Sequence, residues 1–279
     1  MNDPRIDHLL SNPAFAAESD NDDEMVGTIL TRREALAQAG KAGLCAVLSS
    51  TLAGLATTST ASPPQRGTRT ISLLATPQVT EGPFFVDEKL FRSDLVSGSS
   101  RTSVTSGLPL ILNLAVYKLV NNQFIPYPGL YFDVWHADAH GVYSDEPQGL
   151  NAENTQGQTF LRGYQITDSK GTVMFQTIWP GWYIGRTPHI HFKIRAYNAS
   201  GNATSTFTSQ FFFDDSTSDS IFQSSPYYVR NSNGVYNTND NVYSARQADG
   251  TMVGSHLMLN ISANPRGTGA VGTFAIGLT

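Results

Sequence analysis

From about residue 66 onward, hydrophobic and polar residues alternate in short runs separated by glycine, proline, asparagine and aspartate. A period of two is typical of strands that have one buried face. The runs are rich in β-branched and aromatic side chains, which favour extended backbone. The pattern predicts eight strands, over residues 108–119, 131–137, 163–167, 173–179, 189–197, 207–213, 256–261 and 273–278.

The segments between these strands contain turn residues and no helical pattern that alternates with the strands. Residues 168–171, Asp-Ser-Lys-Gly, predict a hairpin turn. Residues 214–250 are polar and predict long loops, with one short helix near 220–223. Because a parallel α/β sheet needs helices between its strands, we expect an all-β fold, a two-sheet antiparallel β-sandwich with long loops.

The N-terminal part of the chain has a different composition. An acidic extension precedes Arg32 and Arg33, and a weakly apolar stretch over 42–56 follows them. Paired arginines before such a stretch resemble a twin-arginine export signal, which serves a pathway that carries folded cargo. A short amphipathic helix over 34–48 is the alternative interpretation. Export would place the mature protein in the periplasm or outside the cell.

These features divide the chain into three predicted parts. We expect an acidic extension and export signal over 1–61, a linker over 62–75, and the β-sandwich domain over 76–279. The acidic residues before Met25 do not suit the positively charged start of a signal. We hypothesise that translation begins at Met25; a tryptic peptide from 6–24 detected in cells would refute this.

Charge and cysteine content exclude several classes of function. The chain has 18 Lys and Arg residues against 23 Asp and Glu, a net charge of −5, so we expect no nucleic-acid partner. The single cysteine, Cys45, excludes an internal disulfide framework and cysteine-based zinc or iron–sulfur sites. No apolar run reaches the length of a membrane span, so we expect none in the mature protein.

Two of the six histidines, His189 and His191, occur as His-x-His within a predicted strand. Alternate residues of a strand face the same side, so both imidazoles face one side while Ile190 and Phe192 face the other. Two imidazoles in this arrangement can bind one metal ion, although two polar residues on a solvent face would show the same spacing. No neighbouring carboxylate or cysteine completes the site.

Four motifs are distributed along the strand-rich part of the chain. They are Thr-Glu-Gly-Pro-Phe-Phe (80–85), Asp-Val-Trp-His-Ala-Asp-Ala-His-Gly-Val-Tyr (133–143), Gly-Arg-Thr-Pro-His-Ile-His-Phe (185–192) and Thr-Ser-Gln-Phe-Phe-Phe (208–213). Together they resemble the intradiol ring-cleavage dioxygenases, non-haem ferric enzymes that split catechols between the two hydroxyls. The resemblance covers about residues 76–278 and implies a β-sandwich, in agreement with the strand pattern.

The resemblance implies four ligands for iron(III): Tyr143, Tyr183, His189 and His191. Two phenolates and a bound hydroxide would balance three positive charges, and hard anionic oxygen stabilises the ferric state. Buried tyrosine resists ionisation, so its deprotonation would depend on the metal. The resemblance also implies a catalytic role for Tyr183, which would leave the metal and take up a substrate proton. Taken singly, Tyr143 could instead cover the sandwich rim, and Tyr183 could cap the core beside Trp182.

Further residues enter through the same resemblance. Arg186 matches an arginine over the bound catechol, where a cation would stabilise negative charge in the ring; a surface ion pair is the alternative. Gln210 matches an amide near the metal and substrate, although an ordinary strand glutamine is the alternative. His136 and His140 fall outside the family pattern. We expect His136 to pack beside its neighbouring tryptophan and His140 to be exposed in a turn.

The resemblance thus implies an enzyme that uses iron(III) and dioxygen to convert a catechol-type substrate into a muconate-type dicarboxylate. Only five residues separate Tyr183 from His189, and no long helical segment precedes the sandwich. These departures from the cytosolic members leave the catechol and the oligomeric state open, and make the chain most similar to the exported single-domain branch. Two other functions remain open: a non-catalytic sandwich that binds aromatic or carbohydrate ligands, and an exported copper oxidase that uses the same histidines.

Overall fold

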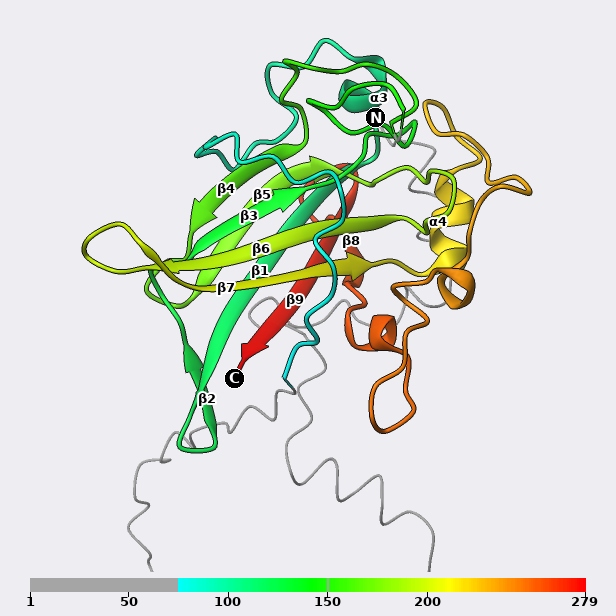
Figure 1. The fold of residues 1–279 in the computed structure, drawn as a ribbon. Coiled ribbons are helices and arrows are strands. Elements are labelled where there is room, and N and C mark those ends of the chain that lie inside the picture. The colour runs from blue at the N-terminus through cyan, green and yellow to red at the C-terminus, as the bar shows by residue number, and fades with distance from the viewer. Residues whose placement is uncertain (1–74, 150) are drawn as a thin grey trace, which may run out of the picture.

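The computed structural model describes residues 75–149 and 151–279 (Figure 1). Two β-sheets pack face to face, and long loops extend from the ends of their strands. This arrangement confirms the predicted all-β sandwich. The predicted extension and export signal over 1–61, and all of the predicted linker except its last residue, lie outside the described residues.

The first sheet contains five strands in the order β2-β1-β9-β8, and β5 also pairs with β1. Pairing between β1 and β9 is parallel, whereas the other pairs of this sheet are antiparallel. The long strand β1 therefore pairs with three other strands, β2, β5 and β9. The strands are β1 (Pro109–Val120), β2 (Gln123–Pro126), β5 (Thr172–Ile178), β8 (Asn260–Ala263) and β9 (Ala270–Leu278).

The second sheet contains four antiparallel strands in the order β4-β3-β6-β7. They are β3 (Tyr131–Trp135), β4 (Arg162–Ile166), β6 (His189–Tyr197) and β7 (Ala203–Phe212). The strand predicted over 189–197 has the bounds of β6. Strand β7 begins four residues before the predicted 207. Its residues 203–206 are all exposed, so they show no alternation of buried and exposed positions from which a strand could be predicted.

Short helices interrupt the loops. They are α3 (Thr102–Thr105), α4 (Asp215–Ile221), and the 3-10 helices η1 (Asn237–Asn239) and η2 (Val253–His256). The side chain of Asp214 accepts a hydrogen bond from the backbone N–H of Thr217 and caps α4. The helix therefore begins at Asp215, five residues before the predicted start near 220. Within residues 75–149 and 151–279, none of the helices has the length and hydrophobicity that a bilayer crossing requires.

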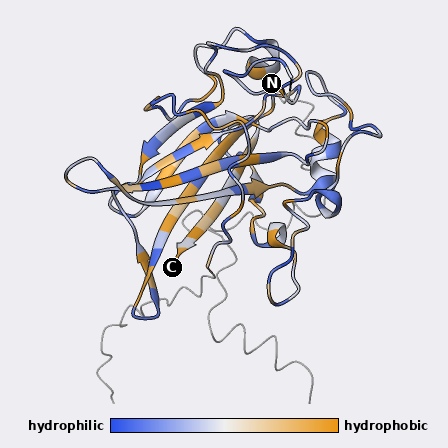
Figure 2. Cartoon of the chain, viewed as in Figure 1, coloured by the Kyte–Doolittle hydropathy of each residue, from blue (hydrophilic) through white to orange (hydrophobic). Residues whose placement is uncertain are grey.

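Alternating residues of the two sheets form the core, and the alternation is visible along the strands in Figure 2. From the first sheet, Leu110, Leu112 and Phe175 are buried; from the second, Ile190 and Phe192 are fully buried against them. Ile190 and Phe192 thus face the core, as predicted. The residues that alternate with them on β6 lie on the outer face of the second sheet.

Two local predictions need correction. Residues 168–171 form the predicted turn, with the Gly171 N–H bound to the Asp168 carbonyl, but β4 and β5 belong to different sheets and form no hairpin. The segment predicted as a strand over 256–261 forms the end of η2 and only the beginning of β8. Hydrophobic pattern alone does not distinguish a strand from a buried irregular segment of the same length.

Candidate metal centre

Four side chains that the sequence analysis singled out meet on the outer face of the second sheet. Nε2 of His189 lies 3.0 Å from Nε2 of His191. It also lies 3.3 Å from the hydroxyl oxygens of both Tyr143 and Tyr183. The structure therefore brings together two nitrogen and two oxygen donors, which are the four residues predicted as ligands.

The cluster is shielded from water. His189 and His191 are 2% and 1% exposed, Tyr143 is 1% exposed, and Tyr183 is half-buried. Burial lowers the pKa of both histidines well below the usual value, so their imidazoles are neutral. Burial raises the pKa of the Tyr143 and Tyr183 phenols above the usual value. Protein groups alone therefore keep all four donors uncharged.

The hydrogen bonds of the imidazoles determine which nitrogen atoms face the cluster. Nδ1 of His189 lies 2.6 Å from the carbonyl oxygen of Thr187. Since a carbonyl oxygen only accepts, Nδ1 carries the proton and Nε2 presents a lone pair to the other donors. Nδ1 of His191 is buried without a hydrogen-bond partner, and the ring is held by stacking on Trp135 with centroids 4.9 Å apart.

Strand register places the histidines and Gln210 on the same face. His191 lies opposite Trp135 on β3 and opposite Gln210 on β7. Residues directly opposite each other in neighbouring strands have side chains on the same side of a sheet. Gln210 is fully buried, and its amide nitrogen donates to the Thr80 carbonyl at 2.9 Å.

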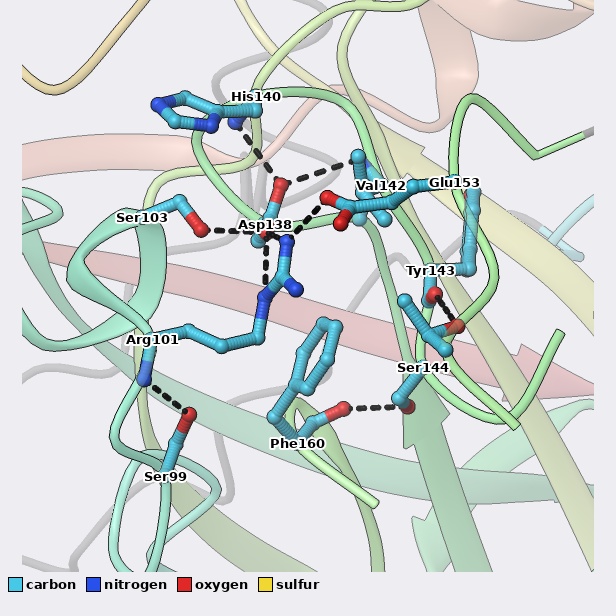
Figure 3. Close-up of polar contacts among 12 residues, drawn as sticks. Ser99, Arg101, Ser103, Asp138, His140, Val142, Tyr143, Ser144, Glu153 and Phe160 are labelled. Carbon is cyan, nitrogen blue, oxygen red and sulfur yellow. Dashed lines mark hydrogen bonds and ion pairs between the residues drawn. The ribbon is translucent and has the colours of Figure 1, made fainter. Parts of the chain in front are cut away.

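Tyr143 is positioned by the loop that follows β3 (Figure 3). The carboxylate of Asp138, fully buried, accepts hydrogen bonds from the backbone N–H groups of His140 and Val142 at 2.9 and 3.0 Å. Its other oxygen accepts from the Ser103 hydroxyl and from Arg101. One carboxylate therefore closes the turn that leads into Tyr143 and anchors that turn to the segment around α3.

Two glycines bring the loops of the two tyrosines into contact. Gly141 has φ +82°, and a Cβ there would lie 2.2 Å from the carbonyl oxygen of Trp182. A Cβ on Gly181 would lie 2.4 Å from the carbonyl oxygen of Ala139. Only glycine permits this approach, so the Tyr143 loop and the Tyr183 loop pack backbone against backbone.

On its other side, Tyr143 is fixed by residues of the 80–85 motif. Its ring stacks on Phe84 with centroids 4.2 Å apart. Arg162, which is 2% exposed, donates to the carbonyl oxygens of both Phe84 and Ser144 and so fixes the positions beside the tyrosine. A Cβ on Gly82 would lie 3.2 Å from the ring of His191, so this motif forms a wall of the centre.

Arg186 is directed into the centre by a turn and two polar partners. The backbone N–H of Arg186 donates to the Tyr183 carbonyl at 3.1 Å, which closes a tight turn between them. The guanidinium donates through Nε to Asp240 at 2.8 Å and through one terminal nitrogen to Gln210 at 2.6 Å. The other terminal nitrogen lies 3.3 Å from Nε2 of His189. The arginine forms an ion pair, but a buried one that orients it toward the metal-ligand candidates.

Comparison with known proteins agrees with this geometry. A family model described as Dioxygenase matches residues 80–232. An intradiol ring-cleavage dioxygenase from Tetranychus urticae is 31% identical, with 74% of this chain and 94% of that chain covered and a TM-score of 0.58. This chain belongs to the intradiol ring-cleavage dioxygenase family. Comparison with curated protein sequences gives no match.

Catechol 1,2-dioxygenase from Acinetobacter sp. ADP1, inhibited by bound mercury, has a similar fold. It is 21% identical, with 74% of this chain and 63% of that chain covered and a TM-score of 0.50. At this identity the likeness concerns the sandwich alone. The residue-level argument for this dioxygenase therefore rests on its own geometry.

The donor set fits the non-haem iron(III) that this family implies. Ligands bound about 2.1 Å from one ion lie about 3 Å apart, and the other three donor atoms lie 3.0–3.3 Å from Nε2 of His189. Among the described residues, no three His, Cys, Asp or Glu side chains form a metal-binding group, and the phenol oxygens are the further donors that lie beside the histidines. Two phenolates favour ferric iron over softer or less charged ions.

The two remaining histidines near the motif lie apart from the donor cluster. His136 is 1% exposed, and its ring nitrogens contact the Thr177 hydroxyl and the Ala137 carbonyl on the core side. The expectation that His136 packs beside Trp135 needs correction, because neighbouring residues of a strand face opposite sides and the Trp135 ring stacks on His191 on the outer face. His140 lies in a turn as expected but is half-buried, because its ring stacks on Tyr228 with centroids 4.4 Å apart.

Three residues that position the site were not identified from sequence: Asp138, Arg162 and Asp240. Asp240 is fully buried and accepts from Arg186 and from three backbone N–H groups. It lies in the polar segment 214–250, where nothing in the sequence separates it from its acidic neighbours. The Asp-x-x-Gly-x-Tyr spacing contained the signal for Asp138, since Asp followed by glycine three residues later is typical of a closed turn.

Proposed function

We propose that this protein is an iron(III)-dependent dioxygenase that cleaves a catechol-type ring between its two hydroxyls. Both atoms of dioxygen would enter the product, a muconate-type dicarboxylate. Membership of the family supports ring cleavage. The metal is supported by the convergence of the donor atoms of Tyr143, Tyr183 and His191 within 3.0–3.3 Å of Nε2 of His189.

The metal would be held by two neutral imidazoles and two phenolates. Ferric iron bound there would chelate both catechol oxygens and draw electron density from them, which makes a ring carbon reactive toward dioxygen. His189 and His191 contribute neutral donors because burial keeps them unprotonated. Tyr143 and Tyr183 contribute the negative charge once a cation offsets the burial that raises their pKa.

The two tyrosines differ in how tightly they are packed, and this difference supports different roles for them. Tyr143 is 1% exposed and stacked on Phe84, so it stays in place. Tyr183 is half-buried, and the next residue, Ile184, is 75% exposed at the rim. Tyr183 is therefore the side chain able to rotate away when substrate arrives, and its phenolate oxygen takes up a catechol proton.

Arg186 and Gln210 act on the substrate side of the centre. The guanidinium is fixed by Asp240 and Gln210, so its remaining N–H groups are preorganised to stabilise negative charge that develops in the ring. Gln210 is a positioning residue, because its oxygen accepts from Arg186 while its nitrogen is bound to Thr80. Neither group needs to move during the reaction.

The test combines metal analysis with product analysis. Protein loaded with ferric iron should show a broad visible tyrosinate charge-transfer band, and a panel of catechols with ¹⁸O₂ should give a dicarboxylate carrying two labelled oxygens. His191→Ala should lose the iron, whereas His140→Ala, a histidine outside the cluster, should retain it. A non-catalytic protein would show no labelled product, and ferric protein without the band would eliminate the tyrosine ligands.

Export is a separate proposal, supported by Arg32 and Arg33 before the weakly apolar stretch over 42–56. Fractionation of the native host, followed by N-terminal sequencing, tests it. Mature protein in the periplasm or medium with its first residue near 57–62 is expected. Full-length protein confined to the cytoplasm would overturn the proposal.

A further inference from the structure

A hollow lies on the outer face of the second sheet, away from the metal centre. Residues of the loop that joins β6 and β7, which is seen in Figure 1, form part of its lining. The hollow encloses about 390 Å³, within the range of ligand pockets, which is about 300–1,000 Å³. The residues that line it are Asp87, Lys89, Tyr131, Tyr164, Arg195, Tyr197, Asn198, Ala199 and Gly201. We call it the tyrosine groove.

The groove is separate from the metal centre. His191 and Tyr197 lie on the same face of β6, six residues apart. At about 3.3 Å per residue, about 20 Å separates them along the strand. Between the two sites, Glu81 from the segment before α3 pairs with Lys193, so that segment covers the middle of the face.

Three tyrosine rings form the wall of the groove. Tyr131 is stacked with Tyr164, with centroids 5.5 Å apart and planes at 22°. It meets Tyr197 edge to face, with centroids 4.8 Å apart and planes at 70°. Phe91, which is 62% exposed, extends the cluster beyond Tyr164 at 5.4 Å. The three tyrosine rings are half-buried, and the steep angle between Tyr131 and Tyr197 offers a ligand two differently oriented apolar surfaces.

The charges around the groove are balanced. Arg195 donates to Asp133 at 2.8 Å and to Asp87 at 3.0 Å, so its guanidinium is neutralised by two carboxylates. Lys89, which also lines the groove, supplies a second positive charge, so two cations stand beside two carboxylates. No net charge therefore favours a phosphate, a carboxylate or a metal cation. The Asp87 side chain is 37% exposed, so its carboxylate can accept further hydrogen bonds from hydroxyl groups. The Asn198 oxygen accepts from the backbone N–H groups of Ser200 and Asn202, which leaves its amide nitrogen as a donor.

We propose that the tyrosine groove binds an uncharged carbohydrate chain. A sugar ring has an apolar face of C–H groups that packs on tyrosine, and hydroxyls at its edge that suit the groove's carboxylate and amide. A phenolic ring would stack equally well, but its one or two hydroxyls would leave most of these polar groups without partners. The groove would anchor the enzyme on a polysaccharide, independently of the chemistry at the metal centre.

Affinity electrophoresis of the full-length protein tests the proposal. Native gels that contain hydroxyethyl cellulose, xylan or laminarin should retard the protein relative to a gel without polysaccharide, for at least one of the three. Tyr164→Ala and Tyr197→Ala should each weaken this retardation at least tenfold. Tyr236→Ala removes a tyrosine that is 46% exposed on a different loop and should leave the retardation unchanged.

The outcomes separate this proposal from the proposed function. Retardation does not require iron, so it should persist in metal-free protein, and circular dichroism shows that each variant is folded. Absence of retardation in all three gels would overturn the proposal, as would retardation that both groove variants retain. Binding of a neutral phenolic dimer, measured by calorimetry and lost in the same variants without any sugar binding, would also overturn it.

Discussion

Asp138→Asn tests whether one buried carboxylate holds the Tyr143 loop. One oxygen of Asp138 accepts two backbone N–H groups, and the other accepts from Ser103 and Arg101 (Figure 3). The asparagine oxygen retains the backbone contacts, but the amide nitrogen is a donor that faces the guanidinium of Arg101. The substitution therefore removes one partner of an ion pair in which Asp138 is fully buried.

Removing one partner of a buried ion pair costs about 3–5 kcal/mol. Arg101 is 19% exposed and retains Glu153 as a partner, so the lower end of this range applies, about 3 kcal/mol. This is about a hundredfold in the folding equilibrium. Because the same loop carries Tyr143, the iron affinity of the folded variant should fall as well.

Urea denaturation of the metal-free protein measures the first effect, and ferric titration monitored by the tyrosinate band measures the second. Glu153→Gln is the matched control, because it removes the other acid bound to Arg101 from a side chain that is 48% exposed. Its cost should stay below about 1 kcal/mol. Equal costs for the two variants, or unchanged iron affinity in Asp138→Asn, would refute the reasoning.

Three further predictions concern the centre and the sheet that supports it. Tyr143→Phe and Tyr183→Phe should each reduce the tyrosinate band of the ferric protein, and stopped-flow mixing with catechol should show slowed proton uptake only in Tyr183→Phe. Asp240→Asn should raise KM for catechol at least tenfold, because Arg186 and the Thr187 N–H lose their shared acceptor; Asp219→Asn, on α4, should leave KM unchanged. Burial raises the pKa of Asp133 to about 6 against the influence of Arg195, so the folded chain retains a proton that the unfolded chain releases at lower pH. The contribution of this group to stability is therefore full below pH 4 and is lost as pH rises through 6. Between these values, the free energy of unfolding of the wild type should fall relative to that of Asp133→Asn. Parallel pH curves for the two proteins would contradict this prediction.

The strands that sequence predicted best are those with one face in the core. Strand β6 was predicted with its full bounds, since Ile190, Phe192 and Ile194 alternate with polar residues over its length. Strand β2 was not predicted, because three of its four residues are exposed and show no alternation. Parallel pairing of β1 with β9 joins segments about 160 residues apart, and no local pattern specifies such a partner.

The candidate site likewise contains residues that could be predicted from sequence and residues that could not. The spacing of His189 and His191 matches the two-residue period of a strand, and the spacing before Tyr143 matches a closed turn. Local sequence therefore predicts where these side chains lie. The partners that orient them come from elsewhere in the chain. Arg162 and Asp240 reach the centre through tertiary contacts, and buried polar partners of this kind have no sequence period.

The first described segment of the domain lies beside its last strand, β9. Thr76 and Gly277 exchange two hydrogen bonds, each at 2.9 Å, so the first described residues and the last strand lie side by side. A short peptide could join position 279 to position 75 without disturbing any strand pairing. New ends opened at the tip of the β1–β2 turn, where Asn121 and Asn122 are exposed, would yield a circular permutant with the same connections through the core. We therefore expect the metal centre to assemble whichever of these segments is synthesised first.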